Sequence, residues 1–410
     1  METALQTFRL GHAADADWET LASSCLAQIG EVPPGANLGF VYVTDTLDGD
    51  LALIADRLRD ETGVAHWVGT VGFGVMVGGR EYFETPAMVA MLGVLPEESF
   101  RILPTVDTPG DPLPDNVMNW AGRANPTLGI VHADPRNAYI ADILNAITDD
   151  TDAFLVGGLT ASRGKQAQIA DRPTEGGVSG VLFGDDIRTV TGLSQGCSPV
   201  GGIHTVTRSE ENILLEIDGR PALDVFREDI GEVLSRNLER VGGYIHAALP
   251  ISGDAAVEDA LGASGADSVG SSGADSVGSS GGDSGDYLVR NIVGIDPDNR
   301  LVAIGERIAA GDRVMFVRRD GAAAAEDLDR MLADVLHRAG TRPKAALYYS
   351  CVARGPNLFG GGSEEMKAVQ AALGDDVPVV GFFANGEISR NRLYSYKTVN
   401  LNLKVPAPAP

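Results

Sequence analysis

The chain repeats one pattern of strand, helix and strand, and this repeat constrains the fold more than any other feature of the sequence. An apolar run beginning at Leu38 (LGFVYVTD) leads to a helical stretch and then to a second apolar run that reaches Gly69. The same order returns from Leu128 (LGIVHADP) to Gly157. Short apolar runs predict buried strands, and the stretches between them place leucine and isoleucine at helical spacing. The N-terminal half therefore predicts an internally duplicated β-α-β-β unit.

A third series follows nearer the C-terminus. A strand is predicted from Val314 (VMFVRRD), then a helix (EDLDRMLADVLHRAG), a strand (AALYYSC), a second helix (SEEMKAVQAAL) and a final strand (VPVVGFFANGEI). Gly381 in the final strand has the place of Gly69 and Gly157 in the earlier series. Alternating strands and helices predict an α/β protein with mixed sheets covered by helices. In such folds, chemistry is expected at the loops where apolar strands end.

The length and net charge of the chain indicate the number of domains and exclude some classes of partner. With 410 residues the chain is long for one core, so two domains are expected. The 57 acidic residues against 32 basic ones give a net charge of -25, which repels a phosphate backbone and argues against nucleic acid as a partner. No apolar run reaches the ~18 residues that a membrane span needs, and the N-terminus lacks a signal pattern. We therefore expect no membrane insertion and a cytoplasmic location.

A low-complexity stretch and the number of cysteines carry further information about the chain. The stretch 262–286 repeats GADSVGSS and contains almost no large apolar side chain, so it cannot offset its own ordering entropy. We expect a disordered Gly/Ser/Asp-rich insertion there. The three cysteines, Cys25, Cys197 and Cys351, are odd in number and match no zinc or disulfide spacing. They are predicted to be reduced thiols.

The stretch CVARGPNLFGGGSEEM, from Cys351, contains the richest set of candidate functional side chains. Ser363 is predicted to cap the following helix with its hydroxyl, and Glu364 and Glu365 suit the positive end of that helix dipole. The preceding glycines could direct backbone amides at an anion, but neither phosphate-loop pattern is present. Cys351 is a conceivable nucleophile near Arg354, although no partner base is evident, and a buried small apolar side chain is the alternative.

Arg354 is the most informative residue of this stretch. An arginine among glycines and apolar residues can hold a carboxylate by a bidentate fork, or it can cap helix carbonyls or pair with Glu387. Asn385 and Gly386 form a turn dipeptide that could close a hairpin, while Glu387 could present a carboxylate to an ammonium group. The predicted ligand-binding residues are Cys351, Arg354, Gly361, Gly362, Ser363, Phe383, Asn385 and Glu387.

The predicted order of strands and helices brings several of these residues close together. Cys351 and Gly381 each lie at or near the end of an apolar strand, and a single helix joins the two strands. If the strands are parallel neighbours, a right-handed crossover places both following loops at the same edge of the sheet. We therefore expect one pocket lined by Cys351, Arg354, Asn385 and Glu387.

These motifs resemble a known family. The stretches GCSPVGGIHTVTRSEENILLEIDGRPALDVF, CVARGPNLFGGGSEEM and VPVVGFFANGEI resemble those of FIST domain proteins, in which a FIST N-terminal module precedes a FIST C-terminal module. The resemblance implies an N-terminal domain over 1–220, with duplicated halves at about 36–105 and 126–200, and a C-terminal domain over 221–410 interrupted by the insertion. It also implies a sensory protein that binds a small ligand, such as an amino acid, and acts on a downstream signalling protein.

Two alternatives stay open. An enzyme would use Cys351 as nucleophile and the glycine-rich amides as oxyanion donors. Some FIST proteins are described as haem-binding sensors of nitric oxide, and a haem would need an axial ligand such as His66, beside Trp67, or Cys351, beside Tyr349. The leading hypothesis is a binding protein without a catalytic residue, a metal or a resident cofactor.

Overall fold

The chain folds into two compact units. In the computed structural model, the described residues are 7–236, 238–241, 244–250, 287–389, 392–394 and 397–404. The first unit comprises Met1–Gln195 and Ala324–Pro410, and the second comprises Gly196–Ala323, which is inserted in the sequence of the first. The predicted disordered insertion at 262–286 lies outside the described residues. Across the part of the chain that the structure describes, every helix is too short or too polar to span a membrane.

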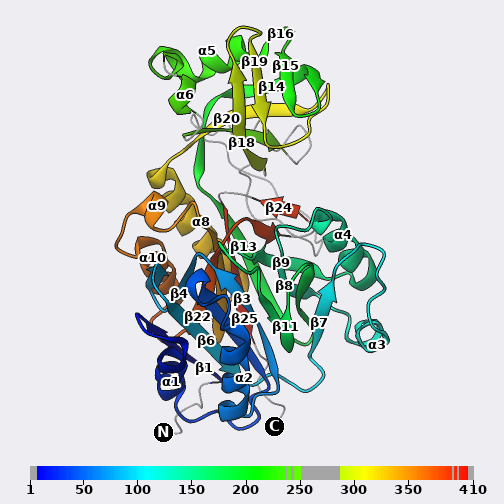
Figure 1. The fold of residues 1–410 in the computed structure, drawn as a ribbon, viewed down its shortest axis with the longest axis vertical. Coiled ribbons are helices and arrows are strands. Elements are labelled where there is room, and N and C mark those ends of the chain that lie inside the picture. Colours follow the sequence, from blue (N-terminus) through cyan, green and yellow to red (C-terminus); the bar gives the residue numbers. More distant parts are fainter. Residues whose placement is uncertain are drawn as a thin grey trace. The chain divides into compact units, whose positions relative to one another are not determined.

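The first unit contains three six-stranded sheets, which share one strand order. Figure 1 draws these strands together with the helices that accompany them. The first sheet has the order β1 (Phe8–Ala14), β6 (Ala87–Gly93), β2 (Leu38–Thr44), β3 (His66–Gly72), β10 (Gln168–Ala170), β11 (Arg172–Thr174). Only β2 and β3 are parallel neighbours. The helices α1 (Trp18–Ile29) and α2 (Leu51–Thr62) contribute apolar side chains to the core on one face of this sheet.

The second sheet repeats this order with later segments. It runs β7 (Phe100–Val106), β12 (Val178–Phe183), β8 (Leu128–Ala133), β9 (Phe154–Leu159), β23 (Glu387–Ser389), β24 (Arg392–Tyr394). Again the third and fourth strands, β8 and β9, are the parallel pair. Its helices are α3 (Asp115–Ala124) and α4 (Ile140–Thr151).

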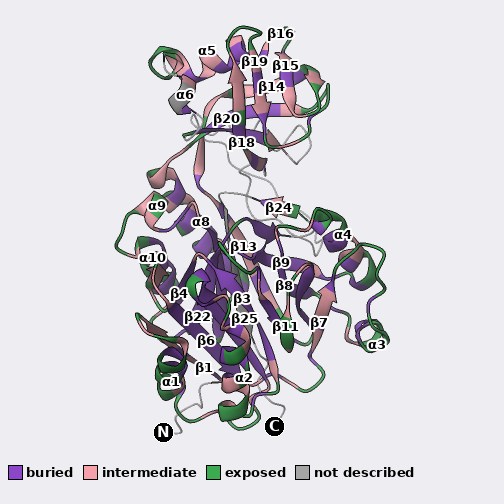
Figure 2. Ribbon diagram, in the orientation of Figure 1, coloured by how far each residue is buried: buried purple, intermediate pink, exposed green. Residues whose placement is uncertain are grey.

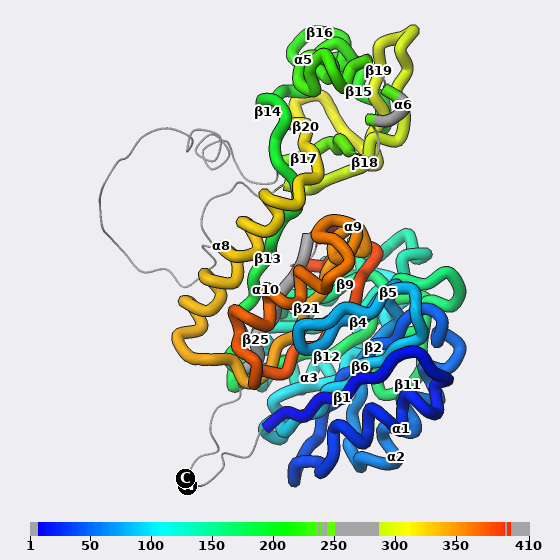
Figure 3. The backbone as a smooth tube through the Cα atoms, turned by 90° about the vertical axis from the view of Figure 1, so that its left-hand side faces the viewer, coloured from blue at the N-terminus to red at the C-terminus, as the bar shows by residue number. Residues whose placement is uncertain are grey.

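The third sheet completes the series. It runs β13 (Arg188–Gln195), β25 (Lys397–Lys404), β21 (Ala345–Cys351), β22 (Val379–Ala384), β4 (Gly74–Val77), β5 (Arg80–Phe83), with β21 and β22 parallel. The helices α8 (Gly321–Ala339) and α10 (Glu364–Leu373) pack on one face, and the short α9 (Pro356–Phe359) precedes α10 (Figure 3). The α/β class with mixed, helix-covered sheets is confirmed.

One strand lies elsewhere than the sequence suggested. The stretch from Val314 does form a strand, β20 (Arg313–Arg319), but β20 belongs to the second unit. The edge strand of the third repeat is β13, and the second unit is inserted between β13 and the body of α8. The long insertion separates β13 from α8 in sequence, so the apolar run just before α8 was predicted to be the first strand of this series.

Each sheet is completed by a hairpin from another repeat. The hairpin β10–β11 of the second repeat pairs with β3 of the first, and β23–β24 of the third repeat pairs with β9 of the second. The hairpin β4–β5 of the first repeat pairs with β22 of the third. The exchange is therefore cyclic, and it covers edges of parallel pairs that would otherwise expose unpaired backbone groups.

Three glycines mark equivalent places in the three sheets. In the parallel pairs, Gly69 lies opposite Val41 and Gly157 lies opposite Val131. Gly381 lies opposite Tyr348 in the same way. A Cβ atom on these glycines would lie 1.8, 1.8 and 1.6 Å from the carbonyl oxygen of the partner residue. Only glycine permits this backbone approach, which explains the residue shared by the three sequence series.

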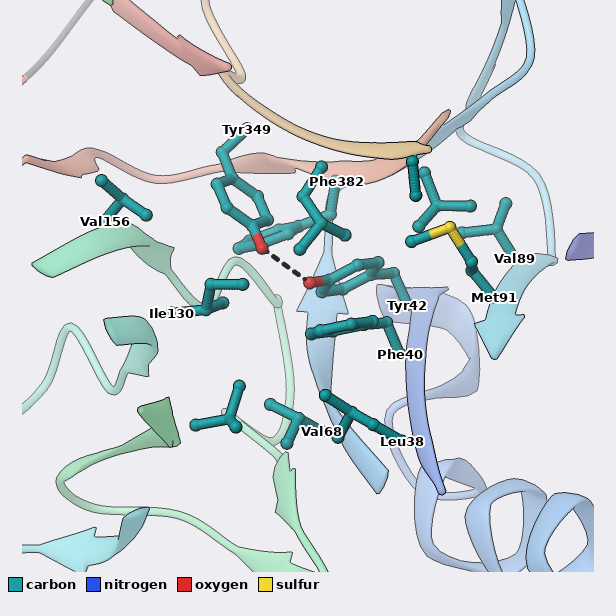
Figure 4. Close-up of a cluster of buried hydrophobic side chains, with 14 of the residues drawn as sticks. Leu38, Phe40, Tyr42, Val68, Val89, Met91, Ile130, Val156, Tyr349 and Phe382 are labelled. Atoms are coloured by element: carbon teal, nitrogen blue, oxygen red, sulfur yellow. Dashed lines mark hydrogen bonds between the residues drawn. The ribbon is translucent and has the colours of Figure 1, made fainter. Parts of the chain in front are cut away.

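The two faces of each sheet contribute to different cores, and Figure 2 shows that much of the strand ribbon of the first unit is coloured as buried. One core contains side chains from all three sheets, including Phe40, Ile130, Leu347 and Phe382. Within it, the hydroxyls of Tyr42 and Tyr349 are hydrogen-bonded at 2.9 Å (Figure 4). The other face of each sheet packs against its own helices.

The second unit is a closed sheet with its own core. Its strands run β14 (Cys197–Glu210), β20, β17 (Ile245–Pro250), β18 (Tyr287–Asp296), β19 (Leu301–Ile304), β15 (Ile213–Ile217), β16 (Arg220–Pro221). A further pairing of β14 with β15 closes this order into a barrel. The helix α5 (Ala222–Ser235) covers it with Phe226 against Phe316, and α6 (Leu238–Val241) follows.

Candidate functional site

A buried ion pair lies on the helix-covered face of the third sheet. Arg354, in the loop after β21, donates from Nε to Oε1 of Glu365 at 2.8 Å, and neither side chain is more than 1% exposed. Glu365 also accepts from the hydroxyl of Tyr348 at 2.9 Å, from the hydroxyl of Ser350 and from the amide of Gly355 at 2.9 Å. A buried carboxylate is tolerated only with this degree of hydrogen bonding. Glu365 therefore organises the loop that follows β21.

Arg354 retains hydrogen-bonding capacity after this pairing. Its two terminal nitrogens, Nη1 and Nη2, are buried and have no hydrogen-bond partner among the described residues. The guanidinium lies over the ring of Phe359, with 5.2 Å from its carbon to the ring centroid. Burial disfavours the charge, but attraction by Glu365, Tyr348 and Glu387 raises the pKa of Arg354 above its ordinary value. The group stays charged, and leaving two such donors unpaired is unfavourable.

Glu81, on the exchanged strand β5, caps helix α10. Its Oε1 accepts from the amide of Met366 at 3.0 Å, while its own amide donates to the hydroxyl of Ser363 at 3.1 Å. The predicted capping of α10 by the Ser363 hydroxyl is therefore wrong. Ser363 has a left-handed backbone, with φ of 59°, which turns its side chain toward Glu81 instead. A carboxylate near the first turn of a helix is favoured by the helix dipole.

The second carboxylate oxygen of Glu81 adds to this buried polar centre. Oε2 is buried and has no hydrogen-bond partner within the described part of the chain. It lies close to the Arg354 loop, since a Cβ on Gly355 would be 3.3 Å from it. Burial raises the pKa of Glu81 to about 7, against the hydrogen bond from Met366 and with repulsion by Glu365 and Glu364. A pKa of this size keeps Glu81 partly protonated near neutral pH.

Glu387 lies on the exchanged strand β23 of the second sheet and is fully buried. Its neighbour Ile388 packs toward α4, so alternation directs Glu387 to the face shared by the three sheets. Asn385 is exposed, and its amide donates to the carbonyl of Leu159 at 3.2 Å. The predicted hairpin at Asn385–Gly386 is wrong, because this turn carries the chain from β22 in the third sheet to β23 in the second. The exchange of strands was not apparent in the sequence.

The strands β21 and β22 are parallel neighbours, as expected. Cys351 nevertheless lies on the opposite face of the sheet from the side chains that contact Glu365, the partner of Arg354. Cys351 pairs with Ala384, so the loops after β21 and β22 do start at the same edge. Tyr348 and Ser350 face Glu365, and alternation therefore places Cys351 on the opposite face of the sheet. The thiol is buried at the end of β21.

The remaining predicted residues divide into two groups. Phe383 is buried on the helix-covered face, where its ring lies 4.4 Å from that of Phe83 and contacts the site that a Cβ on Gly355 would occupy. Gly361 and Gly362 are exposed in the turn between α9 and α10. The structure thus gathers Arg354, Phe383 and, through Glu81, Ser363, while the glycine turn stays at the surface.

The importance of two carboxylates was not apparent from the sequence. Glu365 was assigned to the helix dipole, although its spacing of four residues from the inward Val369 could have indicated a buried position. Glu81 lies far away in sequence and carries no local signal. A third buried polar group, His132, was also not singled out. It contacts the rings of Tyr42 and Tyr349, and burial lowers its pKa to about 3.

His66, which was considered as an axial haem ligand, has a carboxylate and an aromatic ring as neighbours. His66 is partly exposed, and its Nδ1 lies 2.9 Å from a carboxylate oxygen of Asp171. Its ring meets the edge of Phe100. Among the residues that the structure describes, no group of three or more His, Cys, Asp or Glu side chains is arranged to hold a metal ion.

Comparison with known proteins decides the family. The FIST N domain matches residues 37–220, and the FIST C domain matches residues 222–390. The chain belongs to the FIST family. FIST domains are generally taken to be sensory domains of signalling proteins. The boundary between the two matches lies between β16 and α5, inside the second compact unit, so the sequence modules and the compact units divide the chain differently.

Mycobacterial proteins whose names describe them as uncharacterized are similar to this chain. One from Mycobacterium tuberculosis is 28% identical over 334 residues, which cover 78% of this chain and 78% of that protein. Another, from Mycobacterium bovis, is 31% identical over 257 residues, which cover 61% of this chain and 60% of that protein. Their names assign neither ligand nor partner.

Proposed function

We propose that this FIST protein is a cytoplasmic sensor that binds a small zwitterionic metabolite of the amino-acid class at Arg354 and signals to a partner protein. The observation that carries this proposal is the buried guanidinium, whose Nη1 and Nη2 have no hydrogen-bond partner among the described residues. Two parallel N–H groups of arginine match the two oxygens of a carboxylate. A ligand carboxylate would satisfy both donors at once.

The surrounding charges favour a ligand that is also cationic. Glu365 already balances Arg354, so a purely anionic ligand would add an unbalanced negative charge. The buried Oε2 of Glu81 and the buried carboxylate of Glu387, which attracts Arg354, supply negative potential nearby. An ammonium group on the ligand would be attracted by these oxygens. A zwitterion therefore suits the site better than a simple carboxylic acid.

The first experiment is a thermal-shift screen of the full chain against the common amino acids, with acetate and ethylamine as single-charge controls. A ligand that binds the native state raises the apparent stability. We expect at least one amino acid to raise the unfolding temperature at millimolar concentration, and neither control to do so. Haem in the same screen, read at the Soret band, tests the alternative sensor.

The second experiment tests whether the guanidinium of Arg354 binds the ligand carboxylate through two hydrogen bonds. Arg354→Lys keeps the positive charge beside Glu365 but removes the bidentate geometry. We expect it to weaken binding of the amino acid found in the screen by about 1.5–3 kcal/mol, with unfolding still cooperative. The matched control is Arg208→Lys, because Arg208 is an exposed arginine paired with Glu216. No stabilising amino acid, or unchanged affinity in Arg354→Lys, would contradict the proposal.

A further inference from the structure

A histidine in the second unit bridges two carboxylates. His204, on β14, has Nδ1 at 2.7 Å from Oδ2 of Asp218 and Nε2 at 2.9 Å from Oδ2 of Asp229. Ionised carboxylates only accept hydrogen bonds, so both ring nitrogens donate in this arrangement. An imidazole with two donors is an imidazolium. The geometry itself therefore describes the protonated state of His204.

The stretch around His204 is built to bring these groups together. A Cβ on Gly201 would lie 2.1 Å from the carboxyl carbon of Asp229, so this glycine leaves the space that the carboxylate occupies. Asp218 is held from its other side, because its Oδ1 accepts from the amide of Thr205 at 2.8 Å. The bridge thus joins β14, the turn between β15 and β16, and helix α5.

The bridge is attached next to a break in helix α5. Gly231 has φ of 75° and ψ of 168°, which interrupts the helix two residues after Asp229. Before the break, Phe226 and Ile230 are buried in the core of the second unit. After the break, Val233 is 83% exposed. The hydrogen bond to Asp229 therefore fixes the end of the packed half of α5.

We propose that His204, Asp218 and Asp229 form a proton-controlled latch, which holds the end of the packed half of α5 on β14 while His204 is charged and releases it when His204 is neutral. A neutral ring has one nitrogen without a proton, and that lone pair would face a carboxylate oxygen. One of the two contacts then becomes repulsive. The region from Asp229 to the break at Gly231 is the part that becomes free to move.

The other charged groups around the latch are few. Arg220, after the Asp218 turn, attracts Asp218 and forms an ion pair with Glu228 of α5 at 2.7 Å. Glu228 in turn repels Asp229. On β20, the register partner of His204 is the apolar Val314, and Arg313 lies opposite Thr205. A positive neighbour, Arg220, thus acts on Asp218, and a negative neighbour, Glu228, acts on Asp229.

The direction of the switch follows from these contacts. Burial alone would lower the pKa of His204, but the hydrogen bonds to Asp218 and Asp229 raise it above its usual value. Burial raises the pKa of Asp229, whereas hydrogen bonds lower that of Asp218 despite partial burial. The latch contributes stability below the ordinary histidine pKa and loses it as the pH rises through the raised one.

The test is hydrogen exchange of the full chain between about pH 5.5 and 8.5, corrected for the intrinsic rate, with NMR titration of the histidines. We expect protection of the amides of residues 229–231 to fall at least about tenfold as His204 loses its proton, which corresponds to one pKa unit of coupling. Equal protection at all pH values, or a His204 pKa at or below its ordinary value, would overturn the proposal.

Two variants make the test specific. Gly201→Ala adds no titratable group but displaces Asp229, so protection in this segment is expected to be low and independent of pH. If that variant fails to fold, Asp229→Asn removes one carboxylate with little change of shape and is expected to lower the pKa of His204. His337→Gln, which changes a histidine on α8, is the control and should behave as the wild type. A wild-type pH profile in Asp229→Asn would also overturn the latch.

Discussion

The three sheets of the first unit place equivalent strands against their helices, but the third does so with different chemistry. Toward its helices, β2 presents Val41 and Val43, and β8 presents Val131 and Ala133. At the same register, β21 presents Tyr348 and Ser350, and both hydroxyls donate to the buried Glu365. The backbone arrangement is shared, whereas among these equivalent strand positions only those of the third repeat carry polar side chains.

This difference teaches how a repeated fold can acquire a specific site. Apolar contacts are non-directional, so the first two repeats need only matching volume and shape. A buried ion pair must satisfy every donor and acceptor, and it stabilises a protein little compared with apolar side chains of the same size. The buried ion pair of the third repeat therefore stabilises the fold less than apolar side chains would, as expected if Arg354 has the ligand-binding role proposed above.

The largest effect is expected from cutting the chain at the boundary of the sequence modules. Residues 1–220 lack β23–β24 of the second sheet, and residues 221–410 lack β4–β5 and β13 of the third. Neither piece should show cooperative unfolding by circular dichroism. The control removes residues 196–323 and joins the ends, which is feasible because Cys197 and Arg319 are register partners. Cooperative folding of either cut piece would mean that the exchange of hairpins is dispensable.

The next effect concerns the buried ion pair. Glu365→Ala leaves Arg354 as an uncompensated buried charge, and we expect it to lower the free energy of unfolding by about 3–5 kcal/mol in chemical denaturation. At the equivalent strand of the first repeat, Val43→Ala should cost about 1–3 kcal/mol. Adding Arg354→Met to Glu365→Ala should recover part of the loss. A cost for Glu365→Ala no larger than that of Val43→Ala would remove the contrast between the repeats.

The shared frame is tested at the glycines of the parallel pairs. Gly381→Ala, Gly69→Ala and Gly157→Ala each drive a Cβ into a backbone carbonyl, and each should lower the free energy of unfolding by about 1–3 kcal/mol or more. The three costs should be similar, because the backbone approach is the same. Gly122→Ala on the exposed side of α3 is the control and should stabilise by up to about 1 kcal/mol. One glycine that tolerates alanine would show that the frames differ.

The smallest effect is the pH dependence introduced by Glu81. Its folded pKa, about 7, lies above the ordinary value of 4.5, so the folded state binds this proton more tightly than the unfolded state. Its contribution to stability is therefore lost as the pH rises from about 4.5 to 7. Glu81→Gln should stabilise by about 1–2 kcal/mol at pH 8, a value reduced because Glu81 is only partly buried, and by little at pH 4. The comparison is with the exposed Glu97→Gln, and equal pH profiles for the two variants would refute the assignment.

Much of the first unit could be predicted from local patterns. The apolar runs at Leu38 and Leu128 form β2 and β8, and the stretch at Ala345 forms β21. These runs are identified because buried parallel strands are continuously apolar. The predicted domain boundary at residue 220 remains a prediction. The ligand-binding role of the predicted site residues remains a proposal.

The site could be predicted only in part. Arg354 was identified because an arginine among glycines is unusual, and its neighbour Phe383 lies on the following strand. Glu81 could not be identified, because it reaches α10 from a hairpin some 280 residues earlier in the chain. Cys351 was assigned to the same pocket because the two parallel strands end at the same edge of the sheet, but strand alternation turns it to the other face. A shared sheet edge does not decide on which face of the sheet a residue lies.

The sequence by itself determined the order of strands and helices and the three glycines that let parallel strands approach, because periodicity and backbone clashes are local properties. Only the tertiary structure decided which hairpin completes which sheet, since strand edges pair with whichever complementary edge the fold brings near. It also decided that Glu365 neutralises Arg354 and that Glu81 caps α10. Charges pair across space rather than along the chain, and burial sets the pKa at which they do so.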